Sequence, residues 1–259
     1  MASQPTASAT EAHWRKMLIE GHRPLRSKRR LFRYLPSPPR CKVCNNPFGG
    51  LGGRLLGLLG YTPSRKNPNI CVTCCEGLPP GGVEVEIAVL FADLRGSTTV
   101  GERLGARAYA AWLNQFYRAA TAVLLGHDAI IDKLIGDEVM ALFIPGVCGP
   151  DYRRLAAEAA IALRETMAGG RSGAAMPMGI AVYSGVAFVG NLGDTVLDFT
   201  AVGDTINTAA RLASNAAAGE VLFGEAVHAA VAERYPDIEK RALALRGKET
   251  PCAIRVLRP

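Results

Sequence analysis

The fold is decided by the stretch Phe91-Ala92-Asp93-Leu94-Arg95-Gly96-Ser97-Thr98, read together with Lys133-Leu134-Ile135-Gly136-Asp137. Each stretch places one aspartate in a turn beside an apolar run that is typical of a buried strand. If the two strands are neighbours in one sheet, the carboxylates of Asp93 and Asp137 converge. Two convergent carboxylates beside glycines suit a pair of Mg²⁺ or Mn²⁺ ions on a nucleoside triphosphate.

Strands and helices alternate after residue 82. We expect a buried strand over Val83–Phe91, a long helix over Gly101–Gly126 and a hairpin around Gly136-Asp137. The other expected elements are a helix over Asp151–Ala168 with Asp151 as its cap, strands over Met176–Tyr183, Gly185–Gly190 and Val196–Val202, a helix over Asp204–Asn215, and short strands near Val221 and over Ala253–Leu257. Strand–helix–strand–strand–helix–strand is the ferredoxin-like order, so we predict an α+β fold with a βαββαβ core.

The net positive charge is confined to the N-terminal third. Residues 1–80 hold 13 basic and three acidic residues, whereas the rest of the chain holds 17 and 20. We expect a basic helix or pair of helices over Glu11–Leu35, interrupted by Gly21 and Pro24 and ended by the prolines that follow. Such a segment is either a contact for an anionic partner (nucleic acid or an acidic membrane surface) or a solvated basic helix. The sequence gives no firm indication of either partner and leaves the role of Arg23–Arg33 open.

The chain carries no sign of export or of a membrane span. Its first ten residues are polar with no apolar segment behind them, and no run reaches 18 apolar residues. The nearest run, Phe48–Tyr61, is rich in glycine and contains Arg54. A hydrophobic content of 49% supports a packed core. We therefore expect a cytoplasmic protein, in which clustered cysteines favour metal binding over disulfides.

Five of the seven cysteines lie between residues 41 and 75. Cys41-Lys42-Val43-Cys44 and Cys71-Val72-Thr73-Cys74 are two CxxC pairs with 26 residues between them, and four thiolates at such spacing can form a tetrahedral site. Zinc and an iron–sulfur cluster both accept four thiolates, and a module of unmetallated redox thiols is a third alternative. Cys75 is a fifth candidate ligand, and the glycines of Phe48–Gly60 leave room for backbone near a metal. Zinc would make the module a structural or interaction unit, whereas a cluster would make it a sensor of oxygen, oxidants or nitric oxide.

These signals divide the chain into four parts. They are a basic helical segment over residues 1–40, a cysteine-rich metal-binding module over 41–76, a Gly/Pro-rich linker over 77–82 and a catalytic domain over 83–259.

Four stretches of the last part, in the same order and spacing, resemble the catalytic domain of the class III nucleotidyl cyclases, which are adenylate and guanylate cyclases. They are Phe91–Thr98, Lys133–Met140, Phe199–Leu212 and Arg246-Gly247-Lys248. The resemblance covers residues 83–259 and is greatest to bacterial adenylate cyclases. It implies that the 3′-hydroxyl of ATP attacks the α-phosphorus and expels pyrophosphate, which needs metal ions and positive charge but no protein nucleophile.

The resemblance also implies roles for individual residues on the metal side of the site. Asp93 and Asp137 would hold two Mg²⁺ or Mn²⁺ ions per active site, and the Leu94 carbonyl would complete one coordination shell. Backbone amides of Gly96, Ser97 and Thr98 would cradle phosphate oxygens at the start of a helix.

Further residues would act on the nucleotide. Asn207 would orient the ribose and Arg211, four residues later on the same helix face, would stabilise the transition state. Lys248, with Arg246 as the alternative, would hold the terminal phosphates. Lys133 and Thr200 fall where adenylate cyclases of this family contact adenine, so the resemblance favours ATP over GTP.

In this family one subunit gives the metal carboxylates and the other gives the groups that contact base, ribose and phosphate. A chain with both sets implies a homodimer. Two departures weaken the match: Met176–Ile180 lacks an arginine that helps some members bind phosphate, and Ser97 replaces an aromatic residue.

The leading interpretation is therefore an adenylate cyclase that works at a homodimer interface and is regulated by the cysteine module. The alternatives are a guanylate or mixed-specificity cyclase, and a catalytically inert cyclase-like dimeriser whose basic zinc module binds nucleic acid. The signal sensed and the basal activity stay open.

Overall fold

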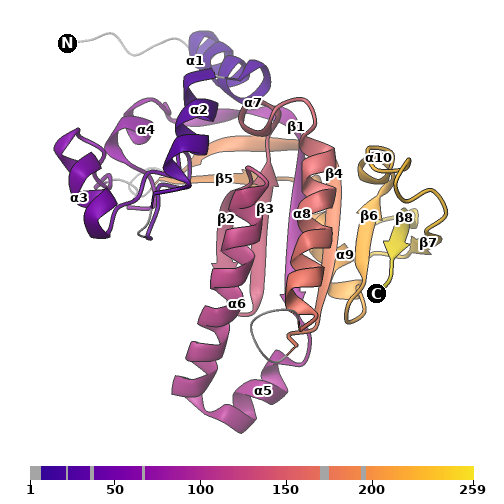
Figure 1. Ribbon diagram of the computed structural model, residues 1–259. Coiled ribbons are helices and arrows are strands. Elements are labelled where there is room, and N and C mark those ends of the chain that lie inside the picture. Colours follow the sequence, from indigo (N-terminus) through magenta and orange to yellow (C-terminus); the bar gives the residue numbers. More distant parts are fainter. Residues whose placement is uncertain (1–6, 22, 36–37, 66–67, 170–174, 194–196) are drawn as a thin grey trace. The chain divides into compact units, whose positions relative to one another are not determined.

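The computed structural model describes residues 7–21, 23–35, 38–65, 68–169, 175–193 and 197–259 (Figure 1). It contains two compact units, which are described separately. The first unit comprises Met1–Glu86, Ile144–Pro150 and Val186–Gly203, and the second comprises Ile87–Phe143, Asp151–Gly185 and Asp204–Pro259. The first proline after the predicted basic helices, Pro36, and the first residue of the strand predicted over Val196–Val202 lie outside the described residues, as do the first six.

The second unit is built on a mixed sheet. Its strands are β1 (Gly81–Leu94, from Ile87 onward), β2 (Ile130–Ile135), β3 (Glu138–Phe143), β4 (Met178–Leu192, up to Gly185), β6 (Val221–Gly224), β7 (Glu239–Leu243) and β8 (Cys252–Leu257). They are hydrogen-bonded in the order β2-β3-β1-β4-β6-β8-β7. The first four strands, with their helices, have the ferredoxin-like arrangement, so the predicted α+β fold is confirmed. Strand β7 was not expected, because its sequence is charged and exposed.

In the described residues of the second unit, the helices are α5 (Ser97–Leu104), α6 (Ala106–Gly126), α8 (Tyr152–Met167), α9 (Asp204–Asn215) and α10 (Glu225–His228). The expected single helix over Gly101–Gly126 is wrong, because Gly105 adopts φ +72° and separates α5 from α6. Asp151 precedes α8 without a side-chain capping bond and instead pairs with Arg154 at 3.1 Å. The two strands expected between Met176 and Gly190 are one strand, β4.

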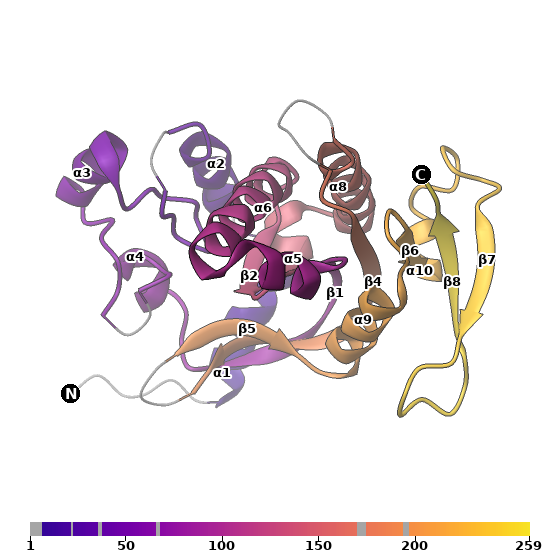
Figure 2. The ribbon, with the colours of Figure 1, turned by 90° about the horizontal axis from the view of Figure 1, so that it is seen from below.

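Helices α6 and α8 lie on the same face of the sheet, as Figures 1 and 2 both show. Their apolar stripes supply the core of this unit, where Phe116, Leu124 and Leu163 are fully buried. On the strands, Ile87 of β1 and Phe143 of β3 are also fully buried. Burial of each such side chain contributes about 1.5–3 kcal/mol of hydrophobic stabilisation. This core stabilises the sheet in which β1 and β3 are paired.

A buried ion pair joins three strands at the far edge of the sheet. Glu220, before β6, accepts hydrogen bonds from Arg241 at 2.8 and 3.1 Å and from the Ala217 amide at 2.9 Å. Arg258 lies 3.7 Å away. The hydrogen bonds from Arg241 hold the pKa of the Glu220 carboxyl below its usual value.

We expect Glu220→Gln to lower the free energy of unfolding at pH 7 by about 1.5–3 kcal/mol, because it removes a charge-assisted pair from a largely buried site. A depressed pKa contributes stability above the ordinary carboxyl pKa and loses it as pH falls below that value. The difference between variant and wild type should therefore shrink below about pH 4.5. Urea unfolding at pH 7 and pH 4 measures this. Glu233→Gln changes an exposed carboxylate that is not one of these ion-pair partners, so it is the matched control and should have little effect. An equal loss in both variants would contradict the assignment.

The first unit contains the N-terminal helices, the cysteines and a β-ribbon. Its elements are α1 (Ala7–Arg15), a π-helical turn η1 (Lys16–Glu20), α2 (Arg23–Phe32), α3 (Gly50–Leu58), α4 (Val72–Glu76), α7 (Pro145–Cys148) and β5 (Asp198–Val202). The expected interruption of the basic helices occurs at Gly21, which adopts φ +82°. Pro24 lies in the first turn of α2, where a missing N–H costs nothing.

Helix α3 was not predicted. The glycine-rich run was expected to give open backbone near a metal, but Gly50–Leu58 is helical. Gly53 is required there, because a Cβ at that position would lie 2.4 Å from the carbonyl carbon of Phe48. The turn before α3 therefore packs against the helix itself.

The segment expected as a linker is packed against β4 within this unit. The Asn191 side chain donates to the Leu78 carbonyl at 2.9 Å. A Cβ on Gly82 would lie 2.3 Å from the Val189 carbonyl oxygen, so the two backbones approach closely only because glycine is present. Residues 81 and 82 are the first residues of β1.

Candidate functional site

The two aspartates of the deciding stretches meet at the end of the sheet. Asp93 is the second-to-last residue of β1 and pairs in register with Glu138 of β3, so Asp137 lies in the hairpin turn next to it. The Leu94 amide donates to the Asp137 carbonyl at 3.1 Å. The turn needs glycine, because Gly136 adopts φ +58°. The expected convergence of the carboxylates follows from this pairing of β1 with β3.

Polar neighbours hold both carboxylates. The Arg95 guanidinium pairs with Asp93 at 2.6 Å, and its second Nη donates to the Ala213 carbonyl. The Ser97 hydroxyl donates to Asp137. Tyr117, on α6, donates its hydroxyl to the Gly136 carbonyl and so supports the hairpin turn.

The electrostatics of the cluster favour a bound cation. Burial raises the pKa of Asp93; Arg95 opposes this and the Asp137 carboxylate adds to it. Burial, followed by Asp93 and Asp137, also raises the pKa of Glu138. Crowded carboxylates disfavour their own charged forms, and a divalent cation relieves that repulsion. Oxygen ligands of this kind are those that Mg²⁺ and Mn²⁺ prefer, so the donor set fits the implied metal ions.

The turn after Asp93 leads directly into α5. Gly96 adopts φ +75° and precedes the helix, whose first residues are Ser97 and Thr98. Gly96 and Thr98 are exposed, whereas Ser97, which donates to Asp137, is buried. The amides at this helix start have no partner in earlier turns of the helix, which is the arrangement that binds phosphate oxygens in other proteins.

A second group of candidates gathers around α9. The Arg211 guanidinium lies against the turn of residues 246–248, since a Cβ on Gly247 would be 3.4 Å from it. Lys248 pairs with Asp204 at the start of α9. Asn207 is exposed on α9, and Arg246 is exposed on the turn. The structure thus places Arg211 on α9 and Lys248 on the turn that packs beside this helix.

The two residues expected to contact the base lie on strands. Lys133 is on β2, at a register shift, and its Nζ is 3.4 Å from the buried Asp132 carboxylate. Thr200 is on β5 in the first unit, opposite Gly190 of β4, and only 5% of it is exposed.

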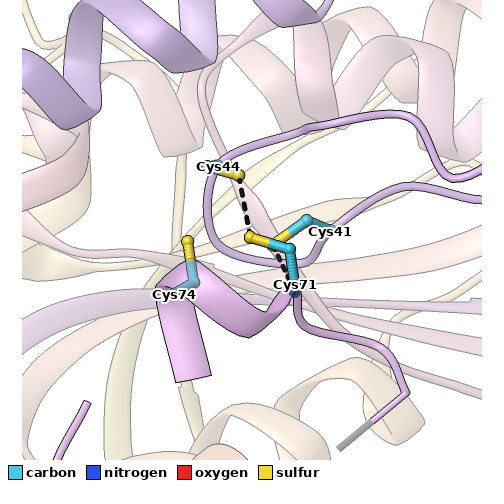
Figure 3. Close-up of side chains that lie close together, drawn as sticks. All are labelled: Cys41, Cys44, Cys71 and Cys74. Atoms are coloured by element: carbon cyan, nitrogen blue, oxygen red, sulfur yellow. Dashed lines mark hydrogen bonds between the residues drawn. The ribbon is translucent and has the colours of Figure 1, made fainter. Parts of the chain in front are cut away.

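The four cysteines of the two CxxC pairs form one cluster in the first unit. Figure 3 shows Cys41, Cys44, Cys71 and Cys74 facing one another, with Cys74 on α4. All four Sγ atoms lie within 4.8 Å of one another. The Cys71 amide donates to Cys41 Sγ at 3.3 Å, and Cys44 Sγ lies 3.7 Å from Cys71 Sγ. Cys75 does not join this cluster in the part of the chain that the structure describes.

The sulfur geometry fits a metal ion. A tetrahedron of Zn–S bonds of about 2.3 Å has sulfurs about 3.8 Å apart, close to the Cys44–Cys71 separation. The loop that carries Cys41 and Cys44 is braced by the buried Arg29, which donates to the Val43 carbonyl. A hydrogen bond from a backbone N–H to a cysteine sulfur, such as that from Cys71 to Cys41, orients the sulfur for metal binding.

Sequence reasoning missed several residues that contact the candidates. Asp204, Asp132 and Glu138 all lie within or beside the quoted stretches but received no role, because a carboxylate partner has no spacing signal of its own. Trp14 stacks on Phe199 of β5 and Lys42 donates to the Phe199 carbonyl. Both residues lie far from β5 in sequence, so no local pattern could have indicated these contacts.

The family model described as "Adenylate and Guanylate cyclase catalytic domain" matches residues 83–254. "Adenylate cyclase 1" of Rhizobium meliloti is 29% identical over 49% of this chain and 20% of its own length. Among solved structures, the adenylyl cyclase CyaB from P. aeruginosa is 29% identical with a TM-score of 0.58, covering 68% of this chain and 96% of that one. The guanylyl cyclase Cya2 is 26% identical with a TM-score of 0.59, covering 68% and 93%.

The chain spans 20% and 34% of the length of two curated relatives that it matches. In the residues described, none of the helices combines the length and apolar character needed to cross a membrane.

Proposed function

Because the chain belongs to the adenylate and guanylate cyclase catalytic domain family, we propose that it is an adenylate cyclase that converts ATP into 3′,5′-cyclic AMP and pyrophosphate. The observation that carries this proposal is the pair of converging carboxylates, Asp93 and Asp137, with Lys133 and Thr200 at the positions expected to contact adenine. The relatives include both adenylyl and guanylyl cyclases, so the choice of ATP rests on those last two residues.

The residues of this chain would divide the work as follows. Asp93, Asp137 and the Leu94 carbonyl would hold two divalent cations, which supply Lewis acidity and neutralise phosphate charge when bound. The amides of Gly96, Ser97 and Thr98 would bind phosphate oxygens. Arg211 would donate to the charge that develops on the α-phosphate, Asn207 would orient the ribose and Lys248 would bind the pyrophosphate end.

Base selection follows from hydrogen-bonding capacity. The Lys133 ammonium donates only, which suits adenine N1, and the Thr200 hydroxyl can accept from the exocyclic amine. Asp132 keeps the Lys133 side chain near the sheet, since the two lie 3.4 Å apart. A hydroxyl can both donate and accept, so Thr200 would discriminate less strictly than a carboxylate.

Cyclase domains of this family typically dimerise, and we propose a homodimer here. Asp93 and Asp137 belong to one end of β1 and β3, whereas Arg211 and Lys248 gather around α9. In the proposed dimer each active site takes the carboxylates from one protomer and the second group from its partner. A monomer should then be nearly inactive.

The test exchanges the base contacts. We expect Lys133→Glu with Thr200→Ser to lower kcat/KM for ATP by about a hundredfold or more and to raise the relative use of GTP. A site that no longer matches adenine leaves its own polar groups unpaired when ATP binds, and this disfavours ATP. Lys240→Glu, a charge reversal on the exposed strand β7, is the control and should keep ATP turnover. Unchanged selectivity in the double variant would show that these residues do not read the base.

For the cysteine module we propose a single zinc ion held by Cys41, Cys44, Cys71 and Cys74. Sulfurs that all lie within 4.8 Å of one another support one central ion. An iron–sulfur cluster distributes its thiolates over two or more irons, which separates sulfurs bound to different irons. We further propose that residues 41–76 regulate the catalytic domain of residues 83–259.

A further inference from the structure

Lys42, between the first two cysteines, reaches the strand that carries Thr200. Its side chain is only 7% exposed, and its Nζ donates to the Phe199 carbonyl at 2.6 Å and lies 3.5 Å from the Asp198 carboxylate. A buried ammonium must find such partners, because an unpaired buried charge is costly. The contact therefore fixes the loop of Cys41 and Cys44 to β5.

The position of this contact on β5 matters. The Phe199 carbonyl belongs to the same planar peptide unit as the Thr200 nitrogen. Lys42 thus hydrogen-bonds to the peptide group that links Phe199 to Thr200. A shift of that peptide moves the Thr200 side chain with it.

The segment that follows the second CxxC pair contacts the same β-ribbon. After α4, the Leu78 carbonyl accepts a hydrogen bond at 2.9 Å from the side-chain amide of Asn191, which is the register partner of Phe199. Gly81 then passes Gly190, the register partner of Thr200, so closely that a Cβ on Gly190 would lie 2.2 Å from the Gly81 carbonyl oxygen. Segments from both halves of the cysteine cluster therefore hold the ribbon at Phe199 and Thr200.

An aromatic contact strengthens this coupling. Trp14 of α1 stacks on Phe199 with ring centroids 6.1 Å apart and an interplanar angle of 13°. Both side chains are at most 1% exposed. The same residue of β5 thus receives Lys42 on its carbonyl and Trp14 on its ring.

We propose that Lys42 is a positioning residue through which metal binding at the cysteine cluster sets the position of Thr200 and thereby base recognition. The role of Thr200 rests on the proposed function. Metal held by Cys41 and Cys44 fixes the loop between them, and the loop presents Lys42 to Phe199. Loss of the metal frees the loop, withdraws the ammonium and loosens the strand that reads the base.

The kinetic test replaces Lys42 by methionine in the full chain. We expect KM for ATP to rise about tenfold and the preference for ATP over GTP to fall, with a smaller change in kcat and with bound zinc unchanged, since Lys42 is not a ligand. Lys42→Arg, which keeps a charged donor, should recover most of the selectivity. The matched control is Lys28→Met, which removes a cation of the same unit that lies over the Tyr61 ring at 5.4 Å instead of on β5. Wild-type KM and selectivity in zinc-loaded Lys42→Met would overturn the proposal.

A second measurement needs no catalysis. The chain has two tryptophans, so Trp112→Phe leaves Trp14 as the reporter at Phe199. Removing zinc with a chelator should shift Trp14 emission to longer wavelength as its contact with β5 loosens, and restoring zinc should reverse the shift. Unchanged emission after complete removal of the metal would overturn the coupling. This readout decides the coupling even if the wild-type protein turns over neither nucleotide, which separates it from failure of the proposed function.

Discussion

Asp93→Ala and Asp137→Ala are each expected to lower cyclase activity by about a thousandfold or more, because each removes a carboxylate that would hold the divalent cations. Cyclic nucleotide formed per minute under saturating Mn²⁺ measures the loss. Asp237→Ala, which removes an exposed carboxylate, is the control and should keep wild-type turnover. Substantial activity in either variant would contradict the assignment of the metal site.

Mixing variants tests how the site is shared. Asp93→Ala and Arg211→Ala protomers should each be inactive alone, and their heterodimer should contain one site with both residues intact. Mixing equal amounts should therefore restore up to about a quarter of wild-type activity, because half of the randomly formed dimers are mixed and each has one competent site. If heterodimers form without any recovery, the two groups do not act across a subunit interface.

The second large effect is expected at the cysteine cluster. Cys44→Ser and Cys71→Ser should each abolish stoichiometric zinc binding, because structural zinc sites of four thiolates carry an apparent binding free energy of about 10–16 kcal/mol that depends on the full ligand set. Elemental analysis of the purified protein and its thermal unfolding measure the loss. The first unit should unfold at lower temperature, since its loops are organised around the four sulfurs.

Two matched cysteines serve as controls for that experiment. Cys75 follows the cluster residue Cys74 in sequence, and Cys252 lies outside the cluster. The Cys75→Ser and Cys252→Ser variants should therefore both bind zinc as the wild type does. Iron and visible absorption in protein purified without air would contradict a zinc site, as would zinc retained by Cys71→Ser.

The fold of the second unit was largely predictable from the sequence. Residues such as Ile87 and Phe143 lie in apolar runs, and the glycine at position 136 marks a hairpin, so the βαββαβ order follows from local pattern. The boundary at Gly105 was missed, because a glycine inside a helical pattern is often tolerated and only its φ of +72° shows the break.

The sequence predicts which residues form the candidate site, but not which partners their side chains contact. Asp93, Asp137 and the four clustered cysteines follow from motif and spacing. The ion pairs of Lys133 with Asp132 and of Lys248 with Asp204 depend on the rotamers and partners that the fold provides. The contact of Lys42 with Phe199 joins residues 157 positions apart, which no local pattern encodes.

The most direct test of the central claim is product analysis of the purified full chain supplied with ATP or GTP and Mn²⁺. The account predicts cyclic AMP and pyrophosphate from ATP, with turnover of GTP at least about tenfold lower, which corresponds to a difference of about 1.4 kcal/mol in transition-state binding. A preference for GTP, or no cyclic product from either nucleotide, would contradict it.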